Sequence, residues 1–157
     1  PYISKVGARI MSLMNPTSKM SKSDPQGCVF LLDSPEEIAR KFKRAVTDSD
    51  TENCVRYDPS EKPGVANLMS IYSSVAGRSF DEIEKEFEGK GYGAFKSAVG
   101  EAVIEALRPV REEAQRIMAD KAYLQQVYTQ GAQKASYTAR KTLRKVYKRV
   151  GFVEKPF

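Results

Sequence analysis

The segment Lys19-Met20-Ser21-Lys22-Ser23, followed by Asp24-Pro25, is the part of this sequence on which the interpretation of the whole chain depends. Pro16 and Pro25 lie on either side of it, and proline disfavours helix, so we predict an exposed loop. Two ammonium groups and two hydroxyl groups within five residues can bind a polyphosphate, because the cations supply charge and the hydroxyls supply directional hydrogen bonds. The alternative is a solvated Lys/Ser loop without a ligand.

The loop carries a complete KMSKS signature, and its flanks narrow the interpretation. These flanks are Gly7-Ala8-Arg9-Ile10-Met11-Ser12-Leu13, Ala45-Val46-Thr47-Asp48-Ser49, Arg56-Tyr57-Asp58, Lys62-Pro63-Gly64 and Glu88-Gly89-Lys90-Gly91-Tyr92-Gly93. Over residues 3–152 the chain resembles the carboxyl-terminal half of bacterial tryptophanyl-tRNA synthetases, a family of class I aminoacyl-tRNA synthetases. The sequence contains no histidine. It therefore lacks the histidine-bearing HIGH signature of that family's first half, and we expect it to be part of an enzyme.

Length and composition are those of an ordinary soluble globular protein. The 157 residues are 41% hydrophobic and 29% charged, which suits one compact domain or one domain with a fragment of another. The net charge of +6 favours a polyanionic partner without identifying one. No apolar run approaches the ~20 residues of a membrane span and no signal peptide is recognisable, so we expect a cytoplasmic protein with no membrane partner.

Cys28 and Cys54 are the only cysteines. They do not have the spacing of metal ligands, and without histidine a zinc site would lack soft ligands. We therefore predict no metal site on these residues, and two inert, half-buried thiols in preference to a disulfide.

The residues before the loop form a short apolar run from Arg9 to Met14. Such a run is typical of a strand buried on both faces of a parallel sheet, and its neighbours are expected outside this sequence. The resemblance implies that it is the last strand of a Rossmann-like α/β nucleotide-binding domain, with Ile10 near the adenine of ATP. Plain core packing is the alternative for Ile10.

Helix signals dominate from Ser34 onward. Ser34 can cap a first turn, Pro35 suits the first helical position and Glu37 completes a capping box. Ser79 and Glu82 repeat the capping pattern. The residues predicted to face inward on the first helix are Ile38, Phe42, Ala45 and Val46.

Apolar spacing predicts three more helical regions. They cover about residues 65–75, a stretch from about Ala94 with a kink at Pro109, and a stretch after Asp120 with a break at Gly131. The predicted fold is mainly α: a helical bundle of the anticodon-binding type, preceded by the last strand and KMSKS loop of the Rossmann-like domain. The predicted domains are residues 1–33, the edge of the catalytic domain, and residues 34–157, the helical tRNA-binding domain.

Cations gather on the first helix and at the carboxyl end of the chain. Arg40, Lys41, Lys43 and Arg44 are predicted to face outward, as a solvated face or as a phosphate-binding patch. Residues 131–157 hold eight Lys and Arg against one Glu. Six of these cations form two rows of spacing four: Arg140, Arg144, Lys148 and Lys141, Lys145, Arg149. Phosphate binding and a solvated final helix both account for them.

The resemblance implies a tryptophan–tRNA ligase: ATP-dependent activation of L-tryptophan and its transfer to tRNA(Trp), with Mg²⁺ accompanying ATP and a homodimeric full-length enzyme. Lys19 and Lys22 are the expected catalytic residues, because they can neutralise charge that builds on the leaving pyrophosphate as the loop closes. The expected ATP-binding residues are Ile10, Lys19, Met20, Ser21, Lys22 and Ser23. The isolated chain is expected to be inactive.

The turn Thr47-Asp48-Ser49-Asp50 is predicted to read the CCA anticodon. A carboxylate accepts a hydrogen bond from the amino group of cytosine and repels the carbonyl that uracil presents there. The alternative is that Asp48 or Asp50 only stabilises the turn. The expected tRNA contacts are Asp48, Ser49, Asp50, Lys43, Arg44, Arg140, Lys141, Arg144 and Lys148, with Lys96 added by the resemblance alone.

Two other functions fit parts of the pattern. One is a non-catalytic RNA-binding helical module whose KMSKS loop is a remnant or a chance match, and the other is a basic protein–protein interaction bundle. The intact Lys19–Ser23 signature and the apolar run before it favour the enzyme, because sequence drift would have blurred both.

Overall fold

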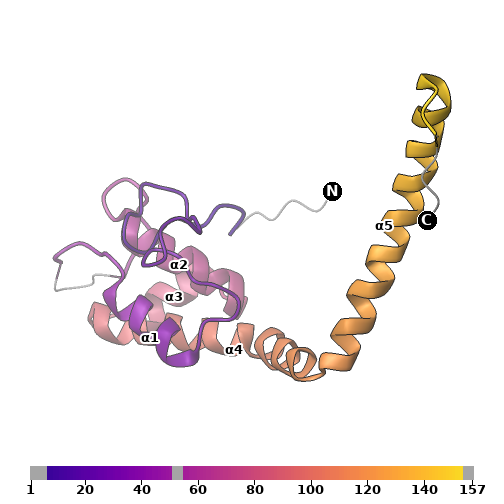
Figure 1. Ribbon diagram of the computed structural model, residues 1–157. Helices are drawn as coiled ribbons and strands as arrows, with labels where there is room; N and C mark the ends of the chain where they lie inside the picture. Colours follow the sequence, from indigo (N-terminus) through magenta and orange to yellow (C-terminus); the bar gives the residue numbers. More distant parts are fainter. Residues whose placement is uncertain (1–6, 51–54, 154–157) are drawn as a thin grey trace. The chain divides into compact units, whose positions relative to one another are not determined.

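The computed structural model describes residues 7–50 and 55–153 (Figure 1). Within these ranges the elements are α1 (Pro35–Arg44), α2 (Pro63–Ala76), α3 (Phe80–Glu86), α4 (Tyr92–Ala119) and α5 (Lys121–Val150). The described residues form no strand, and their β pairing is limited to an isolated antiparallel bridge between Met11 and Lys19. The prediction of a mainly α fold is confirmed.

The strand predicted over residues 9–14 is not formed. Instead the segment folds back on the loop, with Ser12 N donating to Ser18 O at 2.8 Å and Met20 N donating to Ile10 O at 3.0 Å. A strand of a parallel sheet needs a neighbouring strand to accept and donate its backbone hydrogen bonds, and the part of the chain that the structure describes supplies none. Leu13 of this segment is nevertheless buried in the helical core.

The helix starts lie where the capping residues predict them. The Ser34 hydroxyl accepts from Glu37 N, and Ser34 N donates to the Glu37 carboxylate, which completes the capping box of α1. Ser79 and Glu82 form the same box at the start of α3. These predictions are confirmed because a cap depends on groups within one turn of the helix.

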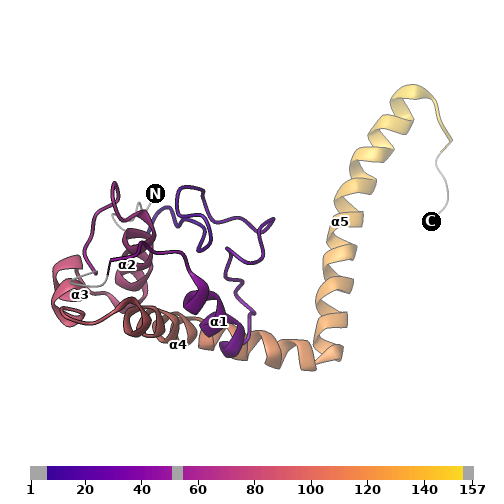
Figure 2. The ribbon, with the colours of Figure 1, turned by 90° about the vertical axis from the view of Figure 1, so that its left-hand side faces the viewer.

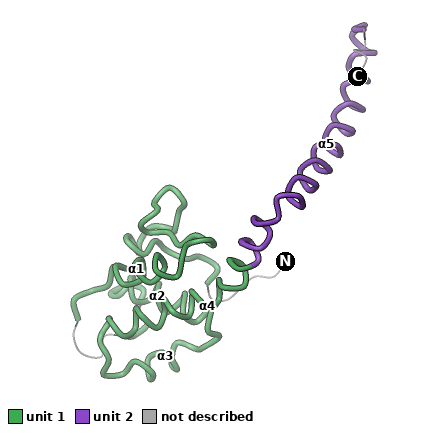
Figure 3. The backbone as a smooth tube through the Cα atoms, turned by 60° about the horizontal axis from the view of Figure 1, so that its bottom comes forward, with its two compact units in different colours: residues 1–112 green, residues 113–157 purple. Residues whose placement is uncertain are grey.

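The chain divides into two compact units, residues 1–112 and 113–157 (Figure 3). In the first unit, α1 lies along α4 (Figure 2), where a Cβ at Gly100 would be 3.4 Å from Phe42 Cβ. The largest fully buried side chains are Phe42, Phe95, Leu13, Ile38, Leu68, Met69, Ile83, Val65 and Val99. Ile10, Leu13, Met20 and Val29, which precede α1, pack on this same core. The domain boundary predicted between residues 33 and 34 stays a prediction.

Two predictions about α1 are wrong. Lys41 does not face outward: it is buried, its Nζ bonds Asp33 Oδ2 at 2.5 Å and lies 4.9 Å from the centroid of the Phe30 ring. The nearby carboxylate and ring compensate the ammonium for its loss of water. Val46 was expected in the buried stripe and is 40% exposed, because α1 ends at Arg44 and the chain leaves the core after Ala45.

The second unit holds the end of α4 and all of α5. The break predicted at Gly131 is wrong, since α5 continues from Lys121 to Val150. One internal glycine costs a helix about 1 kcal/mol, which a 30-residue helix tolerates. α4 continues through Pro109, and the kink expected there stays a prediction. No residue of α5 is buried among those that the structure describes.

Cys28 is a free, buried thiol, and burial raises its pKa. The prediction of an inert thiol suits Cys28, whereas Cys54 lies outside the described residues. None of the helices in the described ranges combines the length and the apolar character that crossing a membrane requires.

Candidate functional site

The KMSKS loop presents its polar side chains to solvent. Lys19, Ser21, Lys22 and Ser23 are exposed. Neither lysine forms an ion pair with any residue in the described ranges, and Met20 packs against the core from its edge. A local turn, in which Asp24 N donates to Ser21 O at 3.0 Å, shapes the loop. Both ammonium groups are therefore accessible to an anion.

The base of the loop is held by Asp24. One carboxylate oxygen accepts from Ser12 Oγ at 3.1 Å and the other accepts from Gly27 N at 3.2 Å. A Cβ at Gly27 would lie 2.0 Å from Ser12 Oγ, so this close packing requires glycine. The sequence pointed to Asp24 only as a flank of the loop, and it missed Ser12 and Gly27 as its anchors.

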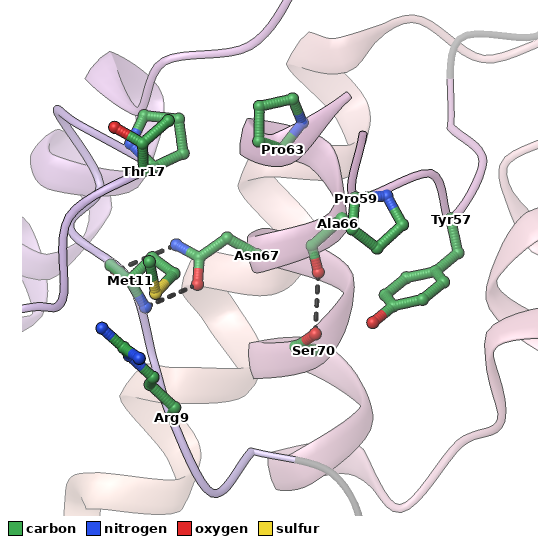
Figure 4. A pocket seen from close by; sticks show the side chains of 10 residues that line it. Arg9, Met11, Thr17, Tyr57, Pro59, Pro63, Ala66, Asn67 and Ser70 are labelled. Carbon is green, nitrogen blue, oxygen red and sulfur yellow. Dashed lines mark hydrogen bonds between the residues drawn. The ribbon is translucent and has the colours of Figure 1, made fainter. Parts of the chain in front are cut away.

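Asn67 of α2 holds the segment that enters the loop. Its Oδ1 accepts from Met11 N and its Nδ2 donates to Met11 O, both at 2.9 Å, so one side chain satisfies both backbone groups (Figure 4). The pair lies beside a cleft of about 360 Å³, with Arg9 and Thr17 on the loop side and Ser70 on α2. Asn67 is a further residue that sequence reasoning missed.

The structure brings together Ile10 and Met20, two of the residues expected to bind ATP. They line an apolar pocket of about 240 Å³ together with Val29, Val75 and Leu107. Both also pack against the core cluster, so the core alternative for Ile10 is compatible with the same geometry. Contact with an adenine stays a prediction.

A buried lysine organises the turn that was predicted to read an anticodon. Lys62 is only 3% exposed; its Nζ donates to Asp48 Oδ1 at 3.1 Å and to Asp50 Oδ2. It also lies 3.1 Å from the Tyr92 hydroxyl, which itself donates to Asp48 Oδ1. Asp50 N donates to the same Asp48 oxygen at 2.9 Å. A Cβ at Gly64 would meet Val46 O at 2.2 Å, so α2 starts in contact with the turn.

Three members of this cluster, Lys62, Asp48 and Tyr92, have a shifted pKa. Burial disfavours the charged form of Lys62, but hydrogen bonds to Asp50, Tyr92 and Asp48 outweigh it, and the pKa of Lys62 is raised. Burial also opposes the charge of Asp48, yet hydrogen bonds from Tyr92, Asp50 N and Lys62 lower its pKa. Burial, and then the bond to Asp48, raise the pKa of Tyr92 to about 12. The cluster therefore holds an ammonium, an ionised Asp48 and a neutral phenol at pH 7.

A cationic cleft of about 400 Å³ lies between α1 and α4. Arg40 and Lys43 of α1 line it together with Lys96 and Glu101 of α4. Burial lowers the pKa of Lys96, and Lys96 forms no ion pair within the described ranges. Of the residues expected to bind tRNA, Lys43 and Lys96 are thus brought together, whereas Arg44 is exposed but does not line the cleft.

The cationic rows near the carboxyl end lie on α5, in the second unit. Their expected tRNA-binding members, Arg140, Lys141, Arg144 and Lys148, are exposed. The loop, the turn and the cleft all lie in the first unit.

Residues 3–108 match the family described as tRNA synthetases class I (W and Y). The chain belongs to this family. It is 50% identical over 155 residues to a tryptophan–tRNA ligase of Clostridium tetani, covering 98% of this chain and 45% of that protein. The identity to the tryptophan–tRNA ligase of Wolinella succinogenes is also 50% over 155 residues, covering 98% and 46%. The chain thus spans about half the length of the curated relatives it matches.

Solved synthetase structures share the fold. Tryptophanyl-tRNA synthetase from Mycoplasma pneumoniae matches with a TM-score of 0.64 and 29% identity, over 96% of this chain and 45% of that one. The enzyme from Campylobacter jejuni, complexed with ADP and tryptophan, matches with a TM-score of 0.72 and 25% identity, over 90% and 44%. In this synthetase chain the KMSKS loop lies on the surface of the first unit, and the polar turn Thr47–Asp50 follows the end of α1.

Proposed function

We propose that this chain supplies the KMSKS ATP-binding loop and the tRNA-binding helices of a tryptophan–tRNA ligase. That enzyme activates L-tryptophan with ATP and transfers it to tRNA(Trp) in the cytoplasm, as a homodimer. The observation that carries the proposal is the complete Lys19–Ser23 signature on an exposed loop, with both ammonium groups unpaired in the described structure and the loop base fixed by Asp24. The two relatives at 50% identity support the choice of tryptophan.

The chemistry asked of this chain is electrostatic. The tryptophan carboxylate attacks the α-phosphorus of ATP. The bond between this phosphorus and the pyrophosphate oxygen then breaks, and negative charge passes to the leaving pyrophosphate. Lys19 and Lys22 stabilise that charge most if the loop reaches the pyrophosphate only in the transition state. Ser21 and Ser23 bond phosphate oxygens or hold the closed loop. A carboxylate is already nucleophilic, so the step needs no general base.

ATP enters this proposal with Mg²⁺. Among residues 7–50 and 55–153, no three His, Cys, Asp or Glu side chains gather in a way that could hold a metal ion. We therefore assign Mg²⁺ no ligand on the described residues. The apolar pocket of Ile10 and Met20 is the proposed contact for adenosine, because the flat ring faces of a nucleobase pack well on apolar side chains.

The helical residues would bind tRNA. The turn at Asp48, Ser49 and Asp50, of which Ser49 and Asp50 are exposed, offers carboxylates to cytosine amino groups. Lys43 and Lys96 in the cationic cleft, with Arg44 nearby in sequence, offer positive charge to neighbouring phosphates. Arg140, Lys141, Arg144 and Lys148 would add affinity without base selectivity. The division into an edge of the catalytic domain, 1–33, and a tRNA-binding domain, 34–157, belongs to this proposal.

The test is tryptophan-dependent ATP–pyrophosphate exchange, followed by charging of a tRNA(Trp) transcript, by the full-length protein that contains this chain. We expect robust exchange and charging. The 157-residue chain alone is expected to show neither, since it lacks a HIGH signature. A full-length protein that binds tRNA but catalyses no exchange would overturn the proposal in favour of a non-catalytic RNA-binding module.

A further inference from the structure

Lys62 is a charged residue of the first unit whose burial calls for an explanation. Its side chain is 3% exposed, and its ammonium group bonds oxygen atoms of Asp48, Asp50 and Tyr92. Burying a lysine is costly unless it is paired, and a lysine is a poor residue for the N-cap position that it occupies at the start of α2. Helix capping therefore does not explain it.

The two carboxylates of the turn have different surroundings. The Asp48 side chain is 24% exposed, and its Oδ2 is buried without a hydrogen bond in the described structure. The Asp50 side chain is 55% exposed and is bonded to Lys62 through Oδ2. Asp50 Oδ1 is thus the carboxylate oxygen of the turn that stays available at the surface. Asp48 is occupied by its partners inside the protein.

We propose that Lys62 is a positioning residue for anticodon readout: it orients Asp50 as the carboxylate that accepts from a cytosine amino group, while Asp48 holds the turn together. This inference rests on the proposed function and deepens it. It assigns recognition of the cytosine to Asp50 and not to Asp48. It also gives a functional reason for Lys62, which need not touch the RNA itself.

Charge supports this assignment. Asp48 and Asp50 are two residues apart, and two carboxylates so close repel each other unless a cation lies between them. Lys62 binds both. One positive charge against two negative charges leaves a net negative charge, and the more exposed carboxylate presents it. An acceptor of that kind suits an amino donor and disfavours the uracil carbonyl.

The turn is also held rigidly, which readout of a single base requires. Lys62 ties it to the start of α2 and the Tyr92 hydroxyl ties it to the start of α4. The contact between Gly64 and Val46 O leaves no room for the turn to shift toward α2. An aspartate on a mobile turn would lose conformational entropy each time it bound RNA, and its affinity would fall accordingly.

The experiment measures kcat/KM of the full-length protein for two tRNA(Trp) transcripts, one with CCA and one with a single cytosine of the anticodon changed to uracil. Each cytosine position is tested in turn. The variants are Asp50→Ala, Lys62→Met and the double variant, and Lys121→Met on exposed α5 is the matched control. We expect each single variant to lower the preference for CCA at one position by about 10-fold. Tryptophan-dependent ATP–pyrophosphate exchange should stay at the wild-type rate, and Lys121→Met should keep the full preference.

The double variant separates positioning from general weakening. If Lys62 acts through Asp50, the double variant loses no more preference than Asp50→Ala alone, because the two residues form one unit. Multiplied losses in the double variant, or wild-type preference in either single variant, would overturn the inference. If Lys62→Met does not fold, Tyr92→Phe replaces it. That variant removes one hydroxyl and is expected to lower the preference by about 3-fold, roughly 0.7 kcal/mol, and an unchanged preference overturns the inference equally.

The wild-type protein tells the two proposals apart. A protein that cannot charge tRNA(Trp) with any anticodon contradicts the proposed function itself. A protein that charges CCA and uracil-substituted transcripts equally well keeps the ligase activity but contradicts anticodon readout by the turn, and with it the positioning inference.

Discussion

The KMSKS loop and the Thr47–Asp50 turn use the same residue types in opposite ways. In the loop, Lys19 and Lys22 are exposed and unpaired among the described residues. At the turn, Lys62 is buried and its ammonium group bonds Asp48, Asp50 and Tyr92. An unpaired cation on the surface can direct its charge at a ligand, whereas a buried pair shapes the backbone around it. Burial and pairing, and not residue type, therefore decide which lysines are candidates for chemistry.

The largest effect is expected from Lys22→Ala in the full-length protein. We expect a loss of about 2–4 kcal/mol of transition-state stabilisation in adenylate formation, as for one oxyanion donor. The Michaelis constant for tryptophan and the unfolding temperature should hardly change, because Lys22 is exposed. ATP–pyrophosphate exchange measures adenylate formation and thermal unfolding measures stability. Lys121→Ala is the control for both. A variant in which only tryptophan binding suffered would show that the role is wrongly assigned.

Asn67→Ala tests how far the loop depends on a buried anchor of its own. The change leaves Met11 N and O without their partners, and we expect a loss of about 1–3 kcal/mol in the free energy of unfolding. Chemical denaturation measures it. Ser70→Ala, on the same face of α2, is the matched control, because its hydroxyl bonds only the carbonyl of Ala66 in its own helix. Equal losses in both variants would show that the Met11 bridge has no special weight.

The pH dependence of stability tests the cluster of Lys62, Asp48 and Tyr92 at the turn. The folded pKa of Tyr92, about 12, lies above its ordinary value of 10.0. Its contribution to stability is therefore fully present below pH 10 and is lost as the pH rises through about 12. We expect Tyr92→Phe to lose less stability than the wild type between pH 10 and 12, as measured by urea unfolding at each pH. Identical pH profiles would mean that the phenol is not coupled to the cluster.

The weakest effect is expected from α5, which contains neither the KMSKS loop nor the Thr47–Asp50 turn. On α5, the triple variant Lys141→Ala, Lys145→Ala and Arg149→Ala should weaken cognate and non-cognate tRNA equally. It should also flatten the dependence of binding on salt by up to about three counterions. Filter binding across a salt series measures the slope. An unchanged slope would favour a solvated final helix.

Local signals in the sequence were sufficient where the structure depends on neighbours along the chain. The caps at Ser34 and Ser79 are of this kind, since each acts within one turn. The prediction of a break at Gly131 failed because glycine only lowers helix stability, while the surrounding residues decide the outcome. Lys41 was misplaced because its partner Asp33 and the Phe30 ring come from the preceding loop.

The candidate site divides in the same way. The KMSKS loop was found because its chemistry lies in five consecutive residues. Lys62, Tyr92 and Asn67 were missed because their partners are far away along the chain: Tyr92 lies 44 residues from Asp48. One signal was present, since a lysine directly before Pro63-Gly64 stands where a helix usually has Ser, Thr, Asp or Asn. A charged residue in a capping position is a reason to look for a distant counter-ion.

The bridge between Asn67 and Met11 also has a consequence for biosynthesis. The two residues are 56 positions apart, and a ribosome adds about 5–20 residues per second. Met11 therefore leaves the peptidyl transferase centre roughly 3 to 11 seconds before Asn67 is added. Until then the segment that enters the loop has no partner for its backbone groups, and an unpaired extended segment is open to wrong pairing. A slow codon between the two positions would lengthen this vulnerable interval, and faster translation of α2 would shorten it.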